Sequence, residues 1–259
     1  MEYRLGRFGV GESIGKAMSI IIDNLPVFLL TGTLVGLASR TLTPLLESLG
    51  PLGSFGSSLL ATLTNSVYTG VVARFVAGKY LRPDSLAGDA AKVIRSLPLI
   101  MAAAVLVSLA VMGGLILLVI PGIIFSLGFY FSTTIVAVEE LGPVAAMKRS
   151  WRLTKGHRGD VFGLNMLLIL IAFAVMVALE FLGRLVSPVG VPGLAKATSL
   201  VTDLLSTIIT GGMTAAASTV FYLGLRTAEE GLEAERIAVT FDLDGIEGAT
   251  EGDPGSAGS

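Results

Sequence analysis

The sequence contains no cysteine and only one histidine among its 259 residues. The absence of cysteine excludes disulfides, a thiolate nucleophile, iron–sulfur clusters and cysteine-based zinc sites. A single histidine cannot supply the several imidazoles of a multi-histidine metal site. These absences exclude several classes of enzyme and metalloprotein, and the sequence predicts no cofactor.

Charged residues are also scarce. They make up 15% of the chain, whereas a soluble domain carries roughly 25%. Hydrophobic residues make up 53%, and the mean hydropathy is +0.79. Because a charge at the centre of a bilayer costs about 3 kcal/mol, this composition is typical of an integral membrane protein. The net charge of −2 argues against a nucleic-acid partner.

Six apolar segments are long enough to cross a bilayer, which takes about 20 helical residues. The run over residues 97–138 is too long for one crossing, and Pro121-Gly122 near its middle predicts a turn between two helices. The predicted spans are residues 25–42, 55–77, 97–120, 121–138, 161–182 and 197–225.

The basic residues orient these spans. With the N-terminus inside, 15 of the 18 Lys and Arg residues fall in inside segments, and the other three are Arg40, Arg184 and Lys196. This bias satisfies the positive-inside rule. The N-terminal segment lacks the apolar core of a signal peptide, so we expect the first span to be retained. The expected location is the cell membrane, with both termini cytoplasmic.

A repeat precedes the spans. Residues 13–30 align without a gap to residues 85–102, and in both copies an amphipathic pattern ends at a Leu-Pro pair that opens a span. Residues 142–156 occupy the third such position. We therefore predict an all-α polytopic domain over residues 1–236, built as three units of interfacial amphipathic helix plus helical hairpin. The alternative is that these helices are ordinary amphipathic connectors.

The interfacial helices are expected over residues 11–24, 84–96 and 142–156. In the third, a helical wheel places four bases within about a third of the circumference: Lys148, Arg149, Arg152 and Lys155. It places Val144, Met147 and Trp151 on the other side. Residues 237–259 are acidic and rich in glycine, and we expect a disordered tail.

Residues 121–165 carry a family resemblance. They contain Pro121-Gly122, then Val138-Glu139 at the end of a span, and then a block that reads G-x-x-x-A-M-K-R-S-W-x-L-T-K-G from Gly142 to Gly156. This pattern resembles the membrane domain of glycerophosphoryl diester phosphodiesterases and its stand-alone relatives. The resemblance implies a helical, polytopic membrane domain.

The same resemblance does not imply phosphodiesterase activity. In the fused relatives, hydrolysis belongs to a separate TIM-barrel domain with paired histidines and metal-binding carboxylates. This sequence offers one histidine and no such domain. The resemblance thus suggests a stand-alone membrane domain and a membrane-associated role.

The basic residues around Trp151, which we call the basic block, allow two interpretations. Tryptophan prefers the headgroup region, and each base near an anionic leaflet contributes about 1 kcal/mol, so a leaflet anchor explains the block. A dedicated site for an anionic lipid headgroup is the sharper hypothesis, because Arg side chains suit phosphate. The candidate headgroup or interface residues are Lys148, Arg149, Trp151, Arg152, Lys155 and His157.

Carboxylates and amides supply the other candidates. Glu139 and Glu140 are expected to dock the third interfacial helix through an ion pair with Arg149 or Arg152; proton or substrate coupling is the alternative. Ionisable groups inside spans suggest function by default. A polar intramembrane cavity, if present, is expected among Asn65, Asn165, Glu180 and Asp203.

No pair of nucleophile and general base is recognisable, so we expect a protein that is not an enzyme. The leading hypothesis is a lipid-interacting or scaffold role in membrane or envelope homeostasis, with membrane lipids as partners. The alternative is a small-molecule or lipid transporter that uses the polar cavity.

Overall fold

The computed structural model describes residues 9–81, 86–186 and 192–230, and the expected tail at 237–259 lies outside them. These described residues form helices and no strand. In chain order the helices are α1 (Val10–Asp23), α2 (Leu25–Glu47), α3 (Pro51–Leu81), α4 (Leu86–Leu117), α5 (Val119–Gly128), α6 (Ser132–Glu139), α7 (Pro143–Leu153), α8 (Arg158–Val186), α9 (Pro192–Ser206), the π-helix η1 (Thr207–Gly211) and α10 (Gly212–Glu230).

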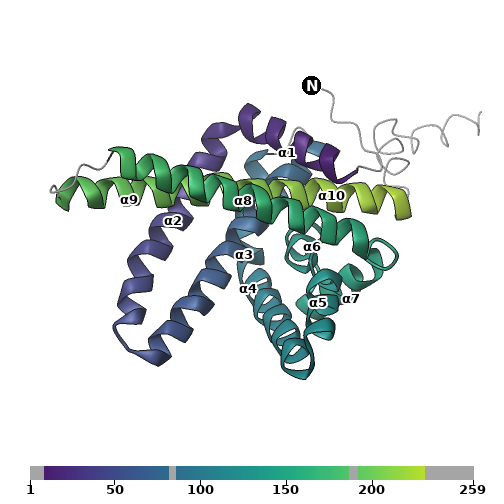
Figure 1. Ribbon diagram of the computed structural model, residues 1–259. Helices are drawn as coiled ribbons and strands as arrows, with labels where there is room; N and C mark the ends of the chain where they lie inside the picture. The colour runs from purple at the N-terminus through teal and green to yellow at the C-terminus, as the bar shows by residue number, and fades with distance from the viewer. Residues whose placement is uncertain (1–8, 82–85, 187–191, 231–259) are drawn as a thin grey trace, which may run out of the picture.

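The protein is an all-α polytopic membrane protein. Six helical segments of the described chain are long and apolar enough to cross a bilayer, which confirms the predicted number of spans: Leu25–Glu47, Pro51–Leu81, Arg95–Leu117, Val119–Glu139, Arg158–Leu185 and Lys196–Glu229. They form three hairpins, and each follows a helical segment that occupies the place of a predicted interfacial helix. Figure 1 shows the α2–α3 and α4–α5 hairpins extending from a common region, while α8 runs alongside α9 and α10.

The common region, which we call the hub, consists of α1, α6, α7, α10 and the adjoining parts of α3 and α4. Most of the largest fully buried side chains of the described residues gather there, among them Tyr68, Tyr80, Phe131 and Tyr222. α10 packs against α1 and α3, and α6 packs against α3, α4 and α7. By contrast, the distal parts of the hairpins expose rows of large apolar side chains, as a lipid-facing surface does.

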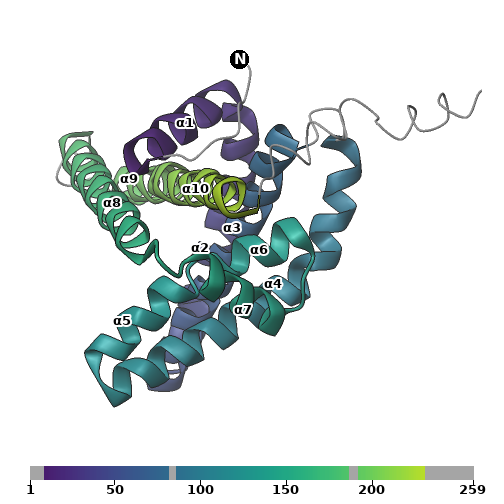
Figure 2. The ribbon, with the colours of Figure 1, turned by 90° about the vertical axis from the view of Figure 1, so that its right-hand side faces the viewer.

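The first unit follows the prediction closely. α1 buries Ser13, Ala17 and Ile20 and ends at Asn24, whose side-chain amide donates a hydrogen bond of 2.9 Å to the Ile20 carbonyl. Pro26 then lies in the first turn of α2, where its missing N–H leaves no hydrogen bond unmade. α1 lies against α10 in both ribbon views (Figures 1 and 2).

The second unit departs from the prediction. α4 is continuous from Leu86 to Leu117 with Pro98 inside it, so the expected boundary between a separate helix at 84–96 and a span at 97–120 is wrong. A proline removes one helical hydrogen bond and crowds the preceding turn. Buried Ile100 and Ala103 hold the helix on α3 just beyond the proline, and packing of this kind lets membrane helices tolerate one.

The predicted span at 121–138 is also not one helix. The chain turns at Leu118, and Pro121 lies in the first turn of α5. The helix then breaks over residues 129–131 before α6 begins. The buried Ser150 hydroxyl, on α7, donates to the Gly128 carbonyl at 2.8 Å and accepts from the Phe131 N–H at 3.2 Å. A side chain from a later helix thus satisfies the backbone groups that the break leaves unpaired.

The third unit ends in a helix with a π-helical segment. α9, η1 and α10 together cover the predicted span at 197–225. α2 approaches this segment through Gly32 and Gly36: a Cβ on Gly32 would lie only 2.6 Å from Cγ1 of Ile208. The absence of side chains at these two glycines therefore sets how closely α2 packs on η1.

Candidate functional site

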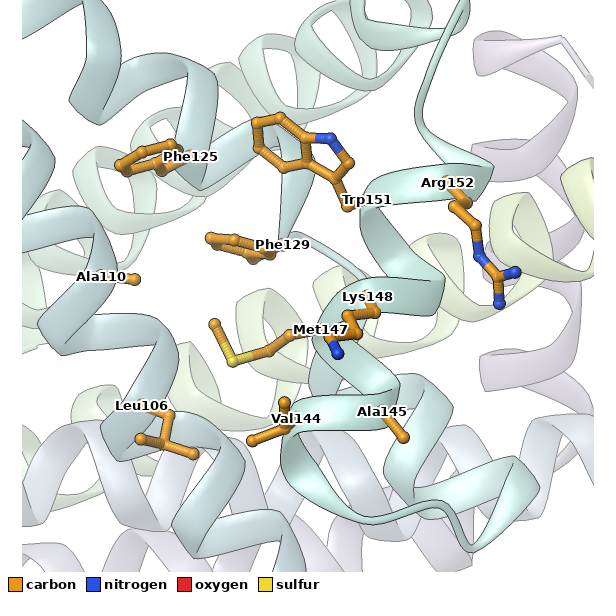
Figure 3. Close-up of a pocket in the computed structure, with 10 residues that line it drawn as sticks. All are labelled: Leu106, Ala110, Phe125, Phe129, Val144, Ala145, Met147, Lys148, Trp151 and Arg152. Carbon is orange, nitrogen blue, oxygen red and sulfur yellow. The ribbon is translucent and has the colours of Figure 1, made fainter.

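A cavity of about 940 Å³ opens between α4, α5 and α7. Most of its lining is apolar or aromatic, and two cationic side chains complete it: the residues are Leu106, Ala110, Phe125, Phe129, Val144, Ala145, Met147, Lys148, Trp151 and Arg152. Figure 3 shows the aromatic side chains on one side of α7 and Arg152 directed away from them. The lining thus combines apolar side chains with two cations, Lys148 and Arg152, which we call the cationic rim; the whole space is called the lateral cavity.

Aromatic contacts shape one wall of this cavity. The Trp151 ring lies 5.3 Å from the Phe129 ring and 6.0 Å from the Phe125 ring, measured between centroids. The guanidinium of Arg158 lies over the Trp151 ring at 4.3 Å, in a cation–π contact. A Cβ on Gly128 would collide with the same indole, so the glycine allows this packing. Trp151 is therefore held by contacts with Phe125, Phe129 and Arg158.

The faces of α7 can be compared with the helical-wheel prediction. Ala146, Ser150 and Leu153 are buried against the hub. Lys148 and Arg152 are exposed, and both also border the cavity that Trp151 lines, although Arg152 is directed away from the aromatic rings (Figure 3). The helical wheel gives the angle of each residue around the helix axis but does not show which angle faces the hub. In the structure, the side that carries the small residues Ala146 and Ser150 faces it.

Arg149 turns the other way, into the hub. Its guanidinium pairs with Glu139 at the end of α6, and the two side chains are only 18% and 12% exposed. The Tyr222 hydroxyl donates to the same carboxylate, and Nε of Arg226 lies 3.7 Å from it. The structure thus places Glu139 against Arg149, one of the two expected partners, and adds two partners from α10.

Glu140 has a different partner from the one expected. It takes a left-handed backbone conformation, with φ of 56°, and its carboxylate accepts a hydrogen bond of 2.6 Å from Arg74 on α3. Arg74 also donates to the Ala137 carbonyl at 2.9 Å. With Glu139 and its partners, these contacts join α3, α6, α7 and α10 through charged groups. We call this set the hub charge network: Arg74, Glu139, Glu140, Arg149, Tyr222 and Arg226.

The two remaining residues of the basic block lie outside the cavity lining. Nε2 of His157 is 3.1 Å from a carboxylate oxygen of Glu229 on α10, and Nδ1 is 3.5 Å from Asp160. The histidine side chain is 15% exposed, so it links the start of α8 to α10. Lys155 is exposed.

The expected polar cavity is assembled only in part. Glu180 and Asp203 line a separate cavity of about 190 Å³ between α8 and α9, whereas Asn65 and Asn165 are not among its lining residues. Asn65 is exposed on α3. Asp203 forms an ion pair with Arg40 of α2, a partner 163 positions earlier in the chain that local sequence spacing did not reveal.

Several residues of these sites escaped sequence reasoning. Phe125 and Phe129 are four residues apart, a spacing that puts both rings on one helix face. This spacing could have identified them as candidate site residues from the sequence. No local signal identifies Arg40, Arg74 or Tyr222, since each meets its partner only through the fold. In the part of the chain that the structure describes, no group of three or more His, Asp or Glu side chains could hold a metal ion.

Comparison with known proteins gives a family. Residues 54–225 match the family model described as a domain of unknown function, DUF7847. The match runs from α3 to α10 and includes every residue that lines the lateral cavity. No curated protein and no solved structure matches the chain. Since the match covers more than half of the sequence, the chain belongs to the DUF7847 family.

Proposed function

We propose that this protein binds an anionic membrane lipid in the lateral cavity, with the headgroup on Lys148 and Arg152 and an acyl chain between α4 and α5. The observation that carries the proposal is the composition of one cavity of about 940 Å³, whose lining is apolar except for Lys148 and Arg152. A lipid is the molecule class whose two ends match these two surfaces.

The headgroup contacts supply the selectivity. An acyl chain that moves from the bilayer into an apolar cavity gains little, because both surroundings are hydrocarbon. Arg152 can donate two parallel hydrogen bonds to a phosphate, and Lys148 adds a compact charge. Charge-assisted hydrogen bonds of this kind contribute about 1.5–3 kcal/mol each. The cationic rim therefore favours an anionic lipid over a neutral one.

The proposal includes the membrane in which the protein lies and its orientation there. The bias of Lys and Arg toward one side supports cytoplasmic termini in the cell membrane, with α1 and α7 in the inner leaflet. The rim of the lateral cavity then faces anionic headgroups. The protein acts as a non-enzymatic lipid-binding scaffold in membrane homeostasis. The resemblance of residues 142–156 to the membrane domain of glycerophosphoryl diester phosphodiesterases supports such a role near lipid metabolism.

A transporter is the alternative, and the geometry supports it less. Transport through the expected polar cavity would need its four residues along one path. Glu180 and Asp203 share a cavity of about 190 Å³, but Asn65 and Asn165 do not line it. Cysteine substitutions along α9 and α10, probed with a membrane-impermeant thiol reagent, test the alternative, because the chain has no native cysteine. Labelling at mid-helix would favour transport over a lipid-binding scaffold.

Native mass spectrometry tests the proposed site. Protein taken from nanodiscs of phosphatidylglycerol and phosphatidylcholine should retain phosphatidylglycerol. The Lys148→Met/Arg152→Met variant should lose about tenfold in retention, since a tenfold change corresponds to about 1.4 kcal/mol. Ala110→Phe keeps both cations, fills the apolar interior and should give the same loss.

Lys155→Met is the matched control, because this base is exposed on the same segment and does not line the cavity. Its retention should fall at most a few-fold, through the weaker attraction of any base near an anionic leaflet. An equal loss from Lys155→Met and from the cavity variants would show that the bases act only as a leaflet anchor. Helical circular dichroism of each variant checks that the fold persists.

A further inference from the structure

We infer that residues 237–247 of this chain, which we call the acidic segment, occupy the lateral cavity and compete there with the anionic lipid. This contact regulates the lipid site proposed above, so its role rests on that proposed function. The charges on α7, the composition of the acidic segment and the position of the end of α10 support it.

The exposed side of α7 carries positive charge that has no partner close by. Lys148 and Arg152 are exposed, and neither forms an ion pair within the part of the chain that the structure describes. Arg149, between them on the same helix, is by contrast paired with Glu139. The two cations border an apolar cavity, so a group that combines negative charge with apolar side chains matches this surface.

The acidic segment has this combination. It contains five large apolar side chains, three carboxylates and no base: Ile237, Val239, Phe241, Leu243, Ile246, Asp242, Asp244 and Glu247. Asp242 and Asp244 flank Leu243, so carboxylates stand next to an apolar side chain, as a phosphate stands next to acyl chains in a lipid. The carboxylates can accept charge-assisted hydrogen bonds from Lys148 and Arg152 while the apolar side chains enter the cavity.

The end of α10 lies close to the cavity. Glu229, in its last turn, contacts His157 at 3.1 Å. The residue after His157 is Arg158, whose guanidinium lies over the Trp151 ring at 4.3 Å, and Trp151 lines the cavity. A few side-chain lengths therefore separate the end of α10 from the cavity. Eleven residues lead from there to Phe241 and can span up to about 36 Å, which is enough.

The covalent link makes weak contacts sufficient. A segment tethered in this way is present at an effective concentration of roughly millimolar, without any further partner. Anionic lipid competes for the same two cations, so the outcome depends on how much of it the surrounding leaflet contains. The acidic segment covers the cavity where anionic lipid is scarce and leaves it where that lipid is abundant.

Disulfide crosslinking tests the contact in the full-length protein, because the chain has no native cysteine. Ala145→Cys, in the cavity lining, is combined with Leu243→Cys or with Ala257→Cys, and each pair is oxidised in phosphatidylcholine nanodiscs. These positions lie 13 and 27 residues beyond the end of α10. Tether length alone then predicts about a threefold difference in rate, by the −3/2 power law. Docking predicts that the pair with residue 243 reacts more than about tenfold faster.

Charge variants test what holds the segment. Asp242→Asn/Asp244→Asn should slow the crosslink at residue 243 about tenfold. In the cysteine-free protein the same change should raise phosphatidylglycerol retention several-fold, measured by native mass spectrometry. Glu251→Gln/Asp253→Asn is the matched control: it removes two carboxylates outside the acidic segment and should change neither readout.

A preference of threefold or less for residue 243, or a crosslinking rate that Asp242→Asn/Asp244→Asn leaves unchanged, would overturn the inference. Unchanged phosphatidylglycerol retention in that variant would refute the competition. Failure of the lipid site itself gives a different result: the unmodified protein would retain no phosphatidylglycerol, while the fast crosslink would still support the contact. Retained lipid without the fast crosslink would leave the lipid site standing and remove the acidic segment from it.

Discussion

Glu139 is the residue whose neutralisation should damage the fold most. Its carboxylate pairs with Arg149, accepts from Tyr222 and lies 3.7 Å from Arg226, and its side chain is 12% exposed. Glu139→Gln keeps the volume of the side chain and removes the charge. Arg149 and Arg226, each 18% exposed, would then share a nearly dry site with no anion from residue 139.

The cost of this change follows from the burial. Removing one partner of a buried ion pair costs roughly 3–5 kcal/mol, because the remaining charge stays desolvated. The residual exposure of these groups places the expectation at the lower end, about 3 kcal/mol. A loss of this size is a large part of the 5–15 kcal/mol that typically stabilises a folded protein.

Unfolding in mixed micelles with increasing dodecyl sulfate measures this loss. Trp151 is the only tryptophan, so its fluorescence reports the packing of α7, and circular dichroism reports the helices as a whole. Glu180→Gln is the matched control. It breaks a pair whose side chains are 60% and 78% exposed, and it should change the unfolding free energy by less than about 1 kcal/mol. Equal losses from the two variants would refute the argument that burial decides the cost.

Three further changes test other parts of the structure. Ser150→Ala should cost about 1–3 kcal/mol, because it leaves a buried backbone N–H unpaired at the break between α5 and α6, and chemical unfolding measures it. Gly32→Ala should cost about 1–3 kcal/mol by overpacking against η1, whereas Gly113→Ala, in open space, should stabilise α4 by up to about 1 kcal/mol; equal melting temperatures would contradict this. Single cysteines at Lys16 and Ser48 should react with an impermeant thiol reagent from opposite sides of the membrane, and labelling from one side would contradict a crossing by α2.

Hydropathy, together with the turn signal of Pro121-Gly122, was enough to predict the number of spans. Each span is a run of apolar residues, and the bilayer requires nothing more specific of its lipid-facing surface. The start of the first span could also be predicted, because Asn24 and Pro26 are residue types that mark the end of one helix and the start of the next. The break between α5 and α6 was not, since it depends on Ser150, more than one helix later in the chain.

The candidate site was predictable by residue type and much less by geometry. Trp151, Lys148 and Arg152 stood out as an aromatic and basic block, and all three line the lateral cavity. The partner of Asp203 could not be found, because Arg40 lies on another hairpin. Periodicity gives the angle of a residue on its own helix and carries no information about which angle meets the neighbouring helix.

The different positions of neighbouring bases on α7 argue for a site rather than a simple anchor. Arg149 follows Lys148 directly, yet it turns into the hub, because Glu139 needs a cation there. Lys148 and Arg152 remain on the other face and border one apolar cavity. A leaflet anchor needs only positive charge near the headgroups, so its bases could stand anywhere on the exposed face. A headgroup site needs its cations beside the space that takes the acyl chain, and Lys148 and Arg152 are the two cations in the lining of that space.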